Sequence, residues 1–265
     1  MMPVVLSELT RLNRRGIVVG WPALTALFAV MINTVMFRVA ADGLAPPGGG
    51  PGVALPTAAE LSTSAGLTAG LAAAANLFGV LTLSFWAIAT AGDYQTGLIR
   101  VLVAAEPRRW KLLAGKVLAL TAATAVTTTI AVVVNLPMAG PSAEAAGIPT
   151  DTWSDGAAGN VLAAWLNTFL AMLVWGVLGC ALAALTRSAA IAISVGVGYL
   201  LVVETLIKTA APDAARWLPG TAVIGLAQGG SDTLSYGATL VAAGVIVTAC
   251  LLVTGLVVAR RPVTD

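Results

Sequence analysis

The sequence has no histidine, only two cysteines and few charges. Of its 265 residues, 10% are charged and 58% are apolar, whereas soluble domains carry about 25% charged and about 45–50% apolar residues. So few charges cannot cover a soluble globule of this size, which argues against a water-soluble enzyme. The missing histidine excludes histidine metal sites, Ser-His-Asp triads and histidine proton relays within the chain. Cys180 and Cys250 stand in apolar stretches, as buried free thiols do, and imply no disulfide framework.

Long apolar runs are abundant, and the mean hydropathy is +0.92. Six runs reach about 20 residues, the length a helix needs to cross a hydrocarbon core about 30 Å thick. None shows the alternation of a barrel strand, and backbone groups in lipid must pair internally. We therefore predict an all-α polytopic membrane protein that forms one domain over residues 1–265. The predicted spans are Ile17–Ala40, Ala65–Ala91, Val117–Met138, Gly159–Leu185, Ala189–Thr209 and Tyr236–Ala259.

The basic residues predict the orientation of these spans. Eleven of the 14 lysines and arginines fall on one side, before the first span, between spans two and three, after span four and after span six. The other side receives only Arg38, Lys208 and Arg216. Because basic residues concentrate on the cytoplasmic side, we expect both termini to be cytoplasmic. The net charge of +2 gives no reason to expect a nucleic-acid partner.

Two segments are predicted to meet the membrane without crossing it. Residues 1–16 form the first, in which Val5, Leu9 and Leu12 share one helical face and Arg11 marks the other. A short basic amphipathic helix of this kind lies in the headgroup layer. The second segment, residues 211–235, holds an apolar run of about twelve residues after Pro219, too short to span, so we expect a re-entrant segment.

The loop 92–116, between spans two and three, is the most informative segment. Asp93 or Thr96 can cap a helix, the run from Leu98 to Ala105 predicts a short apolar-rich helix, and Pro107 ends it and can begin the next one. Four basic residues follow and are expected at the inner headgroups beside Trp110; they are Arg108, Arg109, Lys111 and Lys116. A short helix held below the membrane and joined to two spans suits a lever pushed by a cytoplasmic partner. An ordinary positively charged loop is the plainer interpretation.

This loop resembles that of the permease subunits of type-2 ABC exporters. In that family an acidic residue is followed by Gly-Thr-Leu/Ile-Arg, a short apolar helix, Pro-Arg-Arg and Leu-Leu-Ala-Gly-Lys. The matching residues are Asp93, Gly97, Ile99, Arg100, Pro107, Arg108, Arg109, Leu112, Leu113, Ala114, Gly115 and Lys116. Leu98 stands where threonine is usual. The likeness extends to the layout of an interfacial helix, six spans and a re-entrant segment before the last.

The resemblance implies a multi-pass subunit of a bacterial plasma membrane that pairs with a second permease, identical or homologous, and binds cytoplasmic ABC ATPase subunits. The chain has no phosphate-binding loop, because Gly115-Lys116 is followed by Val117 and no glycine stands five residues before Gly115. It is therefore not an enzyme by itself, and ATP and magnesium belong to the partner ATPase. The implied coupling residues are Asp93, Tyr94, Gly97, Arg100, Glu106, Pro107, Arg108 and Arg109.

The family places its substrate path at the permease dimer interface. Carried over, this implies Asn76, Phe85, Trp86 and Glu204 as lining residues, and an amphiphilic, lipid-like or drug-like cargo. An ionisable group inside a span is a functional candidate, and Glu204 is the clearest one. Lys208 stands four residues on, so Glu204 is either half of a neutralised pair or a gate or substrate contact.

Polar residues also recur along span three. Thr121, Thr124, Thr128 and Asn135 form one stripe, for which hydrogen bonding between helices is the commoner use and a solvated path the alternative.

Three other functions are weighed against the exporter subunit. A secondary transporter or channel often shows repeated halves and intramembrane acids, and we find no convincing repeat and a single deep acid. An intramembrane enzyme would need catalytic groups that the spans lack. A membrane anchor for an ATPase that transports nothing stays open on the sequence.

Overall fold

The computed structural model describes residues 2–12, 19–44, 55–105, 108–230 and 234–260. Within these ranges the secondary structure is helical, without strands, and six helices are long and apolar enough to cross a membrane. The predicted all-helical fold with six helices of spanning length is therefore confirmed. The six are α3 (Gly20–Ala41), α6 (Ala75–Gln95), α8 (Arg109–Ala145), α9 (Ala157–Thr186), the continuous Ala189–Ala210 and α14 (Tyr236–Arg260).

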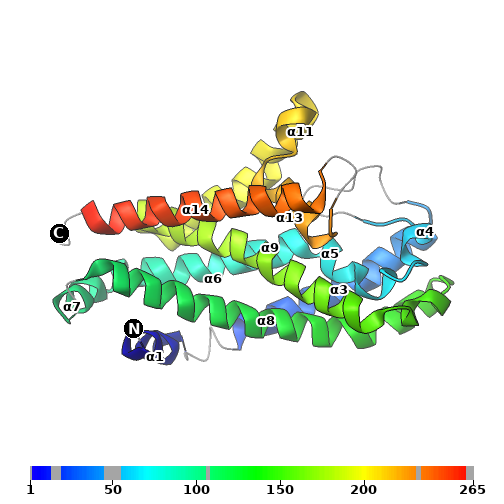
Figure 1. Cartoon of the computed structure of the whole chain (residues 1–265), viewed down its shortest axis with the longest axis horizontal. Helices are drawn as coiled ribbons and strands as arrows, with labels where there is room; N and C mark the ends of the chain where they lie inside the picture. Colours follow the sequence, from blue (N-terminus) through cyan, green and yellow to red (C-terminus); the bar gives the residue numbers. More distant parts are fainter. Residues whose placement is uncertain (1, 13–18, 45–54, 106–107, 231–233, 261–265) are drawn as a thin grey trace.

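The fifth of these helices consists of three parts. It runs through α10 (Ala189–Gly198), the π-helical η3 (Tyr199–Val203) and α11 (Glu204–Ala210). Figure 1 shows α11 leaving the bundle, so the π-helical turn coincides with a change of direction. Such turns are frequent where a helix is bent.

The other long helices run side by side, and the bundle has two distinct ends (Figure 1). One end carries α1 (Met2–Leu12), α7 (Leu98–Ala105) and the last turn of α14, and we call it the α7 end. The other end carries α4 (Ala58–Leu61) and the connection between α8 and α9, and we call it the α4 end. Five shorter elements complete the fold: η1 (Gly66–Thr68), α5 (Ala69–Ala73), η2 (Asp151–Ser154), α12 (Pro212–Ala215) and α13 (Pro219–Ala227).

Two predicted boundaries differ from the structure. The second span was expected to run unbroken from Ala65, but η1 and α5 precede α6, which begins at Ala75. In this broken stretch the carbonyl of Leu67 accepts a hydrogen bond from Asn135 Nδ2, at 3.1 Å. The third span is longer than expected, because α8 continues through Pro137 and Pro141; a membrane helix tolerates proline where its freed backbone groups find other partners.

The pair α6 and α9 forms the centre of the fold. Trp175 of α9 lies against Gly79 of α6, where an added Cβ would be 2.0 Å from the indole Cδ1. Trp86 of α6 lies against Gly176 of α9 in the same way, with a Cβ-to-Cε2 distance of 2.7 Å. Both indoles are fully buried. Each helix thus places a tryptophan on a glycine of the other, which lets their backbones approach closely.

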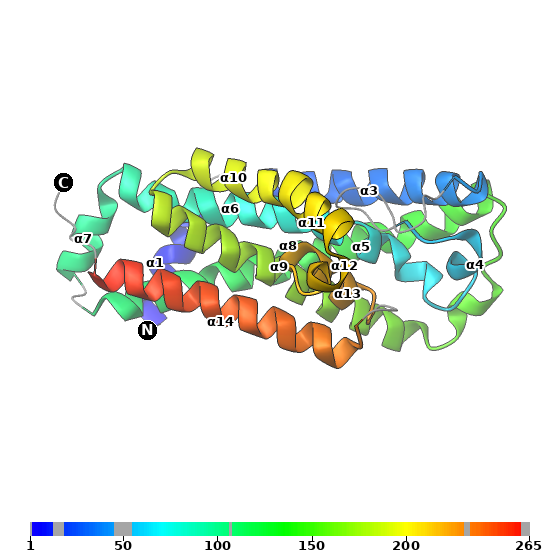
Figure 2. The same ribbon diagram turned by 90° about the horizontal axis from the view of Figure 1, so that it is seen from above.

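Two helices at the periphery, α10 and α14, flank the α6–α9 pair on opposite sides, as the view from above shows (Figure 2). In α9, 67% of the most apolar 18-residue stretch is buried within the chain, against 22% in the α10–α11 helix and 17% in α14. The exposed apolar side chains of α10–α11 and α14 suit contact with lipid or with another membrane helix.

The segments 1–16 and 211–235 are partly described. A helix does form at Met2–Leu12, with Leu6 57% exposed and Glu8 buried, so a polar face meets the protein. The short helix α13 begins at Pro219 and packs against α9 and α14. Their positions relative to a membrane stay predictions, and residues 1, 13–16 and 231–233 of these segments lie outside the described ranges.

Candidate functional site

Four charged side chains from three helices meet at the α7 end. Lys116, in the second turn of α8, donates to Glu8 of α1 at 3.0 Å and to Asp93 of α6 at 2.8 Å. Arg11 of α1 pairs with both of these carboxylates. We call Glu8, Arg11, Asp93 and Lys116 the ion cluster. Its two acids and two bases balance, and all but Arg11 are buried.

The ion cluster ties α1 to the two helices that flank α7. Lys116 Nζ also donates to the carbonyl of Ala89, one turn before Asp93, at 3.2 Å. Removing one partner of a buried ion pair typically costs about 3–5 kcal/mol, because the other charge is left uncompensated. The ends of α6 and α8 therefore hold a fixed position relative to each other and to α1.

The short helix α7 spans the gap between these two helix ends. It covers Leu98–Ala105, the range expected from the sequence, and it packs against α6 and α8. Gly97 precedes it with a φ of 69°, a left-handed conformation that glycine adopts without strain at the end of α6. Val101 of α7 is 63% exposed and therefore accessible to a partner.

Two expectations for this loop are wrong. Asp93 does not cap a helix, since α6 continues past it to Gln95 and its carboxylate belongs to the ion cluster. Thr96 instead donates from Oγ1 to the carbonyl of Gly92, at 2.7 Å. Lys116, expected among headgroup cations, is only 8% exposed. In both cases a buried partner of opposite charge, far away in the sequence, outweighs the local preference.

The other predicted coupling residues surround the same end. The ring of Tyr94 lies 5.8 Å from the guanidinium of Arg187, which follows α9. Arg109 donates to the carbonyl of Val258 at 2.9 Å and so joins the start of α8 to the end of α14. Arg108 is exposed and precedes α8. Arg100 contributes its backbone to α7, while Glu106 and Pro107 lie outside the described residues.

Glu204 occupies a second buried site, where the fifth spanning helix meets α13. Its carboxylate accepts from the backbone N–H of Gly220 and from the hydroxyl of Thr221, both at 2.9 Å. Lys208 lies 3.3 Å away and is 37% exposed, whereas Glu204 is fully buried. The predicted Glu204–Lys208 pair therefore exists. The carboxylate also faces the N-terminus of α13, where free N–H groups and the helix dipole favour an anion.

The predicted path residues lie inside the chain. Asn76 donates to the carbonyl of Gly220 at 3.3 Å and accepts from Trp175 at 3.1 Å, so it connects the Glu204 site to the α6–α9 pair. Trp86 donates to Thr124 at 3.1 Å. Phe85 is half-buried and stacks on Trp21 with ring centroids 4.9 Å apart. In this conformation they contact other parts of the same chain, and their role as path lining stays a prediction.

Three of the four residues of the predicted stripe on α8 make the expected contacts between helices, while the fourth, Thr121, is half-buried. Thr124 accepts from Trp86, Thr128 lies 3.3 Å from the sulfur of Met172, and Asn135 accepts from Asn33 at 2.7 Å. These side chains are buried in the bundle, as interhelical bonding requires.

The ion cluster is the feature that the sequence reading missed. Glu8 and Arg11 stand three residues apart on an amphipathic segment, and Asp93 and Lys116 flank the loop at the ends of two predicted spans. An acidic residue so close to a membrane span is costly unless a basic residue pairs with it. The position of these acidic residues was therefore the signal in the sequence that could have indicated ion pairs.

No family model matches the chain, and neither does any curated protein. A function must therefore be argued from the loop 92–116, the ion cluster and the apolar helices themselves.

Proposed function

We propose that the chain is the membrane-spanning permease subunit of an ATP-driven ABC exporter. It pairs with a second permease, identical or homologous, and moves an amphiphilic, lipid-like or drug-like substrate outward. ATP is hydrolysed by separate cytoplasmic ATPase subunits, and the α7 end faces the cytoplasm of a bacterial cell. The positive charge of the loop 92–116 and of the two terminal segments supports this orientation.

The observation that carries the proposal is the setting of α7. It is a short helix with an exposed Val101, joined at both ends to spanning helices that the ion cluster holds together. A push on α7 would therefore move α6 and α8 as a unit instead of being absorbed by a loose loop. Because α6 interlocks with α9, the displacement would reach the centre of the bundle.

A contact experiment tests the ATPase partner directly. A photo-crosslinking amino acid replaces Val101 in cells that carry the full complex, and crosslinked products are probed with a photoreactive ATP analogue. We expect an ATP-labelled adduct at Val101. The control is Leu44, which is 70% exposed and lies beyond α3 at the other end of the bundle. Absence of an adduct at Val101, or an equal one at Leu44, contradicts the proposal.

A coupling experiment tests the role of α7. Replacing residues 106–109 with glycine and serine should leave the spans folded and the ATPase bound but abolish transport in vesicles. The matched control replaces residues 42–44, which are exposed at the other end, and should transport normally. Unchanged transport in the 106–109 variant removes the coupling role. Transport by the purified chain without any ATPase would instead indicate a secondary transporter or channel.

A further inference from the structure

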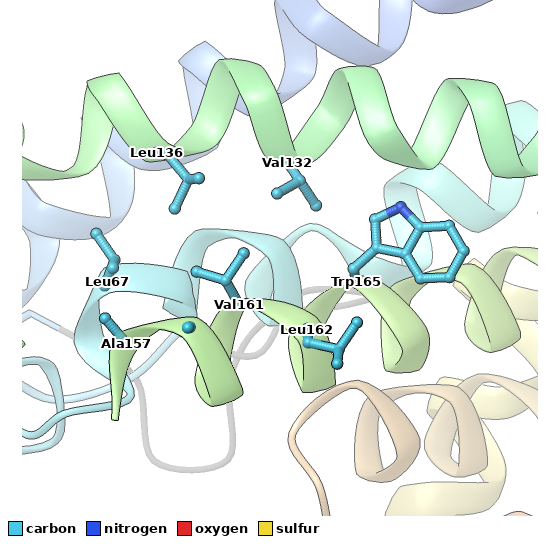
Figure 3. Close-up of a pocket in the computed structure, with 8 residues that line it drawn as sticks. Leu67, Val132, Leu136, Ala157, Val161, Leu162 and Trp165 are labelled. Atoms are coloured by element: carbon cyan, nitrogen blue, oxygen red, sulfur yellow. The ribbon is translucent and has the colours of Figure 1, made fainter. Parts of the chain in front are cut away.

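An open apolar pocket of about 860 Å³ lies between α8 and α9, towards the α4 end. Figure 3 shows Val132 and Leu136 extending from α8 towards Val161 on α9, with Trp165 at one end and Leu67 of η1 at the other. The volume falls in the range of small-molecule sites, about 300–1,000 Å³. None of the path residues implied by the resemblance lines it.

The lining favours an alkyl chain over a polar solute. The side chains are aliphatic except for Trp165, whose indole N–H already donates to Thr129 Oγ1 at 3.0 Å. A hydrophilic ligand would find no polar partner among these residues and would lose its hydration without compensation. An alkyl chain matches the aliphatic lining and brings no polar group that needs a partner there.

The chain segment that leads into the pocket at Ala157 carries negative charge. The segment 139–158, which joins α8 to α9, contains three acidic residues and no basic one. Asp151 and Asp155 are exposed, and Asp155 stands two residues before Ala157, which lines the pocket. Arg38 at the end of α3 does not reverse the sign, because Asp42 and Glu60 accompany it at this end.

The remaining basic residues of this half lie elsewhere. Lys208 belongs to α11 and Arg216 follows α12, and Figure 1 shows α11 on the opposite side of the bundle from α8. The charged residues that stand nearest in the sequence to the lining of the α8–α9 pocket are therefore acidic, which complements a cationic headgroup.

We propose that this pocket binds a cationic amphiphile, with its alkyl tail between α8 and α9 and its positive headgroup at Asp151 and Asp155. The inference rests on the proposed export function and narrows its cargo to alkylammonium-like compounds. Binding needs neither ATP nor the ATPase, so it is tested separately from coupling.

The test uses the full chain in nanodiscs of zwitterionic lipid and brominated dodecyl probes that quench tryptophan fluorescence. One probe carries a trimethylammonium headgroup, one a neutral and one a sulfate headgroup, and concentrations are expressed per mole of lipid. The difference between wild type and Trp165→Phe isolates the signal of Trp165, provided that both unfold at the same temperature. We expect saturable quenching of Trp165, strongest for the cation.

Variants separate the tail contribution from the headgroup contribution. An exposed charge pair changes affinity by about two- to fivefold, so Asp151→Asn and Asp155→Asn should each weaken only the cation to that extent. Asp213→Asn, on the exposed helix α12, is the matched control and should change nothing. Val161→Phe, which narrows the pocket, should weaken all three probes.

Three results would overturn the proposal. Equal affinity for the cationic and neutral probes would make the pocket a general acyl-chain site. Quenching that persists undiminished in Trp165→Phe would place the probe elsewhere. No quenching by any probe would mean that the pocket is closed to amphiphiles, whether or not α7 contacts an ATPase.

Discussion

The ion cluster and the Glu204 site bury carboxylates in two different ways. In the ion cluster, Glu8 and Asp93 share Lys116 and Arg11, so the charges are balanced by other charges from separate helices. At the other site, Glu204 is held mainly by the N–H of Gly220 and the hydroxyl of Thr221, with a partly exposed lysine nearby.

The ion cluster and the Glu204 site have different structural roles. Charge pairing between distant segments fixes the relative position of α1, α6 and α8, and it fails as soon as one charge is removed. A carboxylate at a helix N-terminus fixes the start of α13 through neutral donors, and part of that bonding survives loss of the charge. We therefore expect larger effects at the ion cluster than at Glu204.

The largest effect is expected for Lys116→Met. It leaves two buried carboxylates with Arg11 alone, and the free energy of unfolding should fall by about 3–5 kcal/mol. Equilibrium unfolding of the purified chain in detergent, followed by circular dichroism, measures it. Arg260→Met removes an exposed cation from the same end and should lower the free energy of unfolding much less. Equal losses for the two variants would contradict the stabilising role of the ion cluster.

The next effect is expected for Gly220→Ala. A Cβ at this position would lie 2.7 Å from each oxygen of the Glu204 carboxylate and 2.7 Å from Leu200 Cδ1. Crowding of this kind costs about 1–3 kcal/mol. Gly140→Ala on α8, where a Cβ meets nothing within 4 Å, is the control and should be neutral or stabilising. Similar melting curves for the two variants would contradict the packing at Glu204.

A smaller effect is expected for Glu204→Gln. The amide oxygen can still accept from Gly220 N–H, so we expect a loss of about 1–2 kcal/mol, the difference between a charged and a neutral acceptor. The same unfolding assay applies, with the exposed Glu144→Gln as control. A loss as large as that of Lys116→Met would mean that Glu204 depends on charge pairing after all.

The smallest effect is expected for Lys208→Met, below about 1 kcal/mol, because an ion pair with an exposed partner is weak. Double-mutant cycles sharpen the comparison. The coupling energy of Lys208→Met with Glu204→Gln should be smaller than that of Lys116→Met with Glu8→Gln. The reverse order would exchange the roles assigned to the two sites.

The sequence predicts features that depend on long apolar runs or on residues that stand close together in the chain. Runs of about 20 apolar residues identify spanning helices because only length and hydrophobicity are needed, and the range Leu98–Ala105 follows from its apolar run and from Pro107 after it. The Glu204–Lys208 pair was also visible, since its members are one helical turn apart.

The missing part depends on contacts between distant segments. Lys116 and Glu8 are 108 positions apart, and nothing local to either residue identifies its partner. The donors to Glu204 lie 16 and 17 residues further on, at the start of α13, and their proximity depends on how α11 and α13 meet. In the broken stretch before α6, the carbonyl of Leu67 likewise accepts from Asn135 of α8, 68 positions further on.

The paired tryptophans of α6 and α9 restrict how the molecule can change shape. Sliding or rotating one of these helices along the other would drive an indole into the backbone beside Gly79 or Gly176. We therefore expect α6 and α9 to move together as one rigid body. The helices around them are less covered by the rest of the chain, and the fifth is also interrupted by the π-helical turn between Tyr199 and Val203, so under the proposed export function we expect the shape change there.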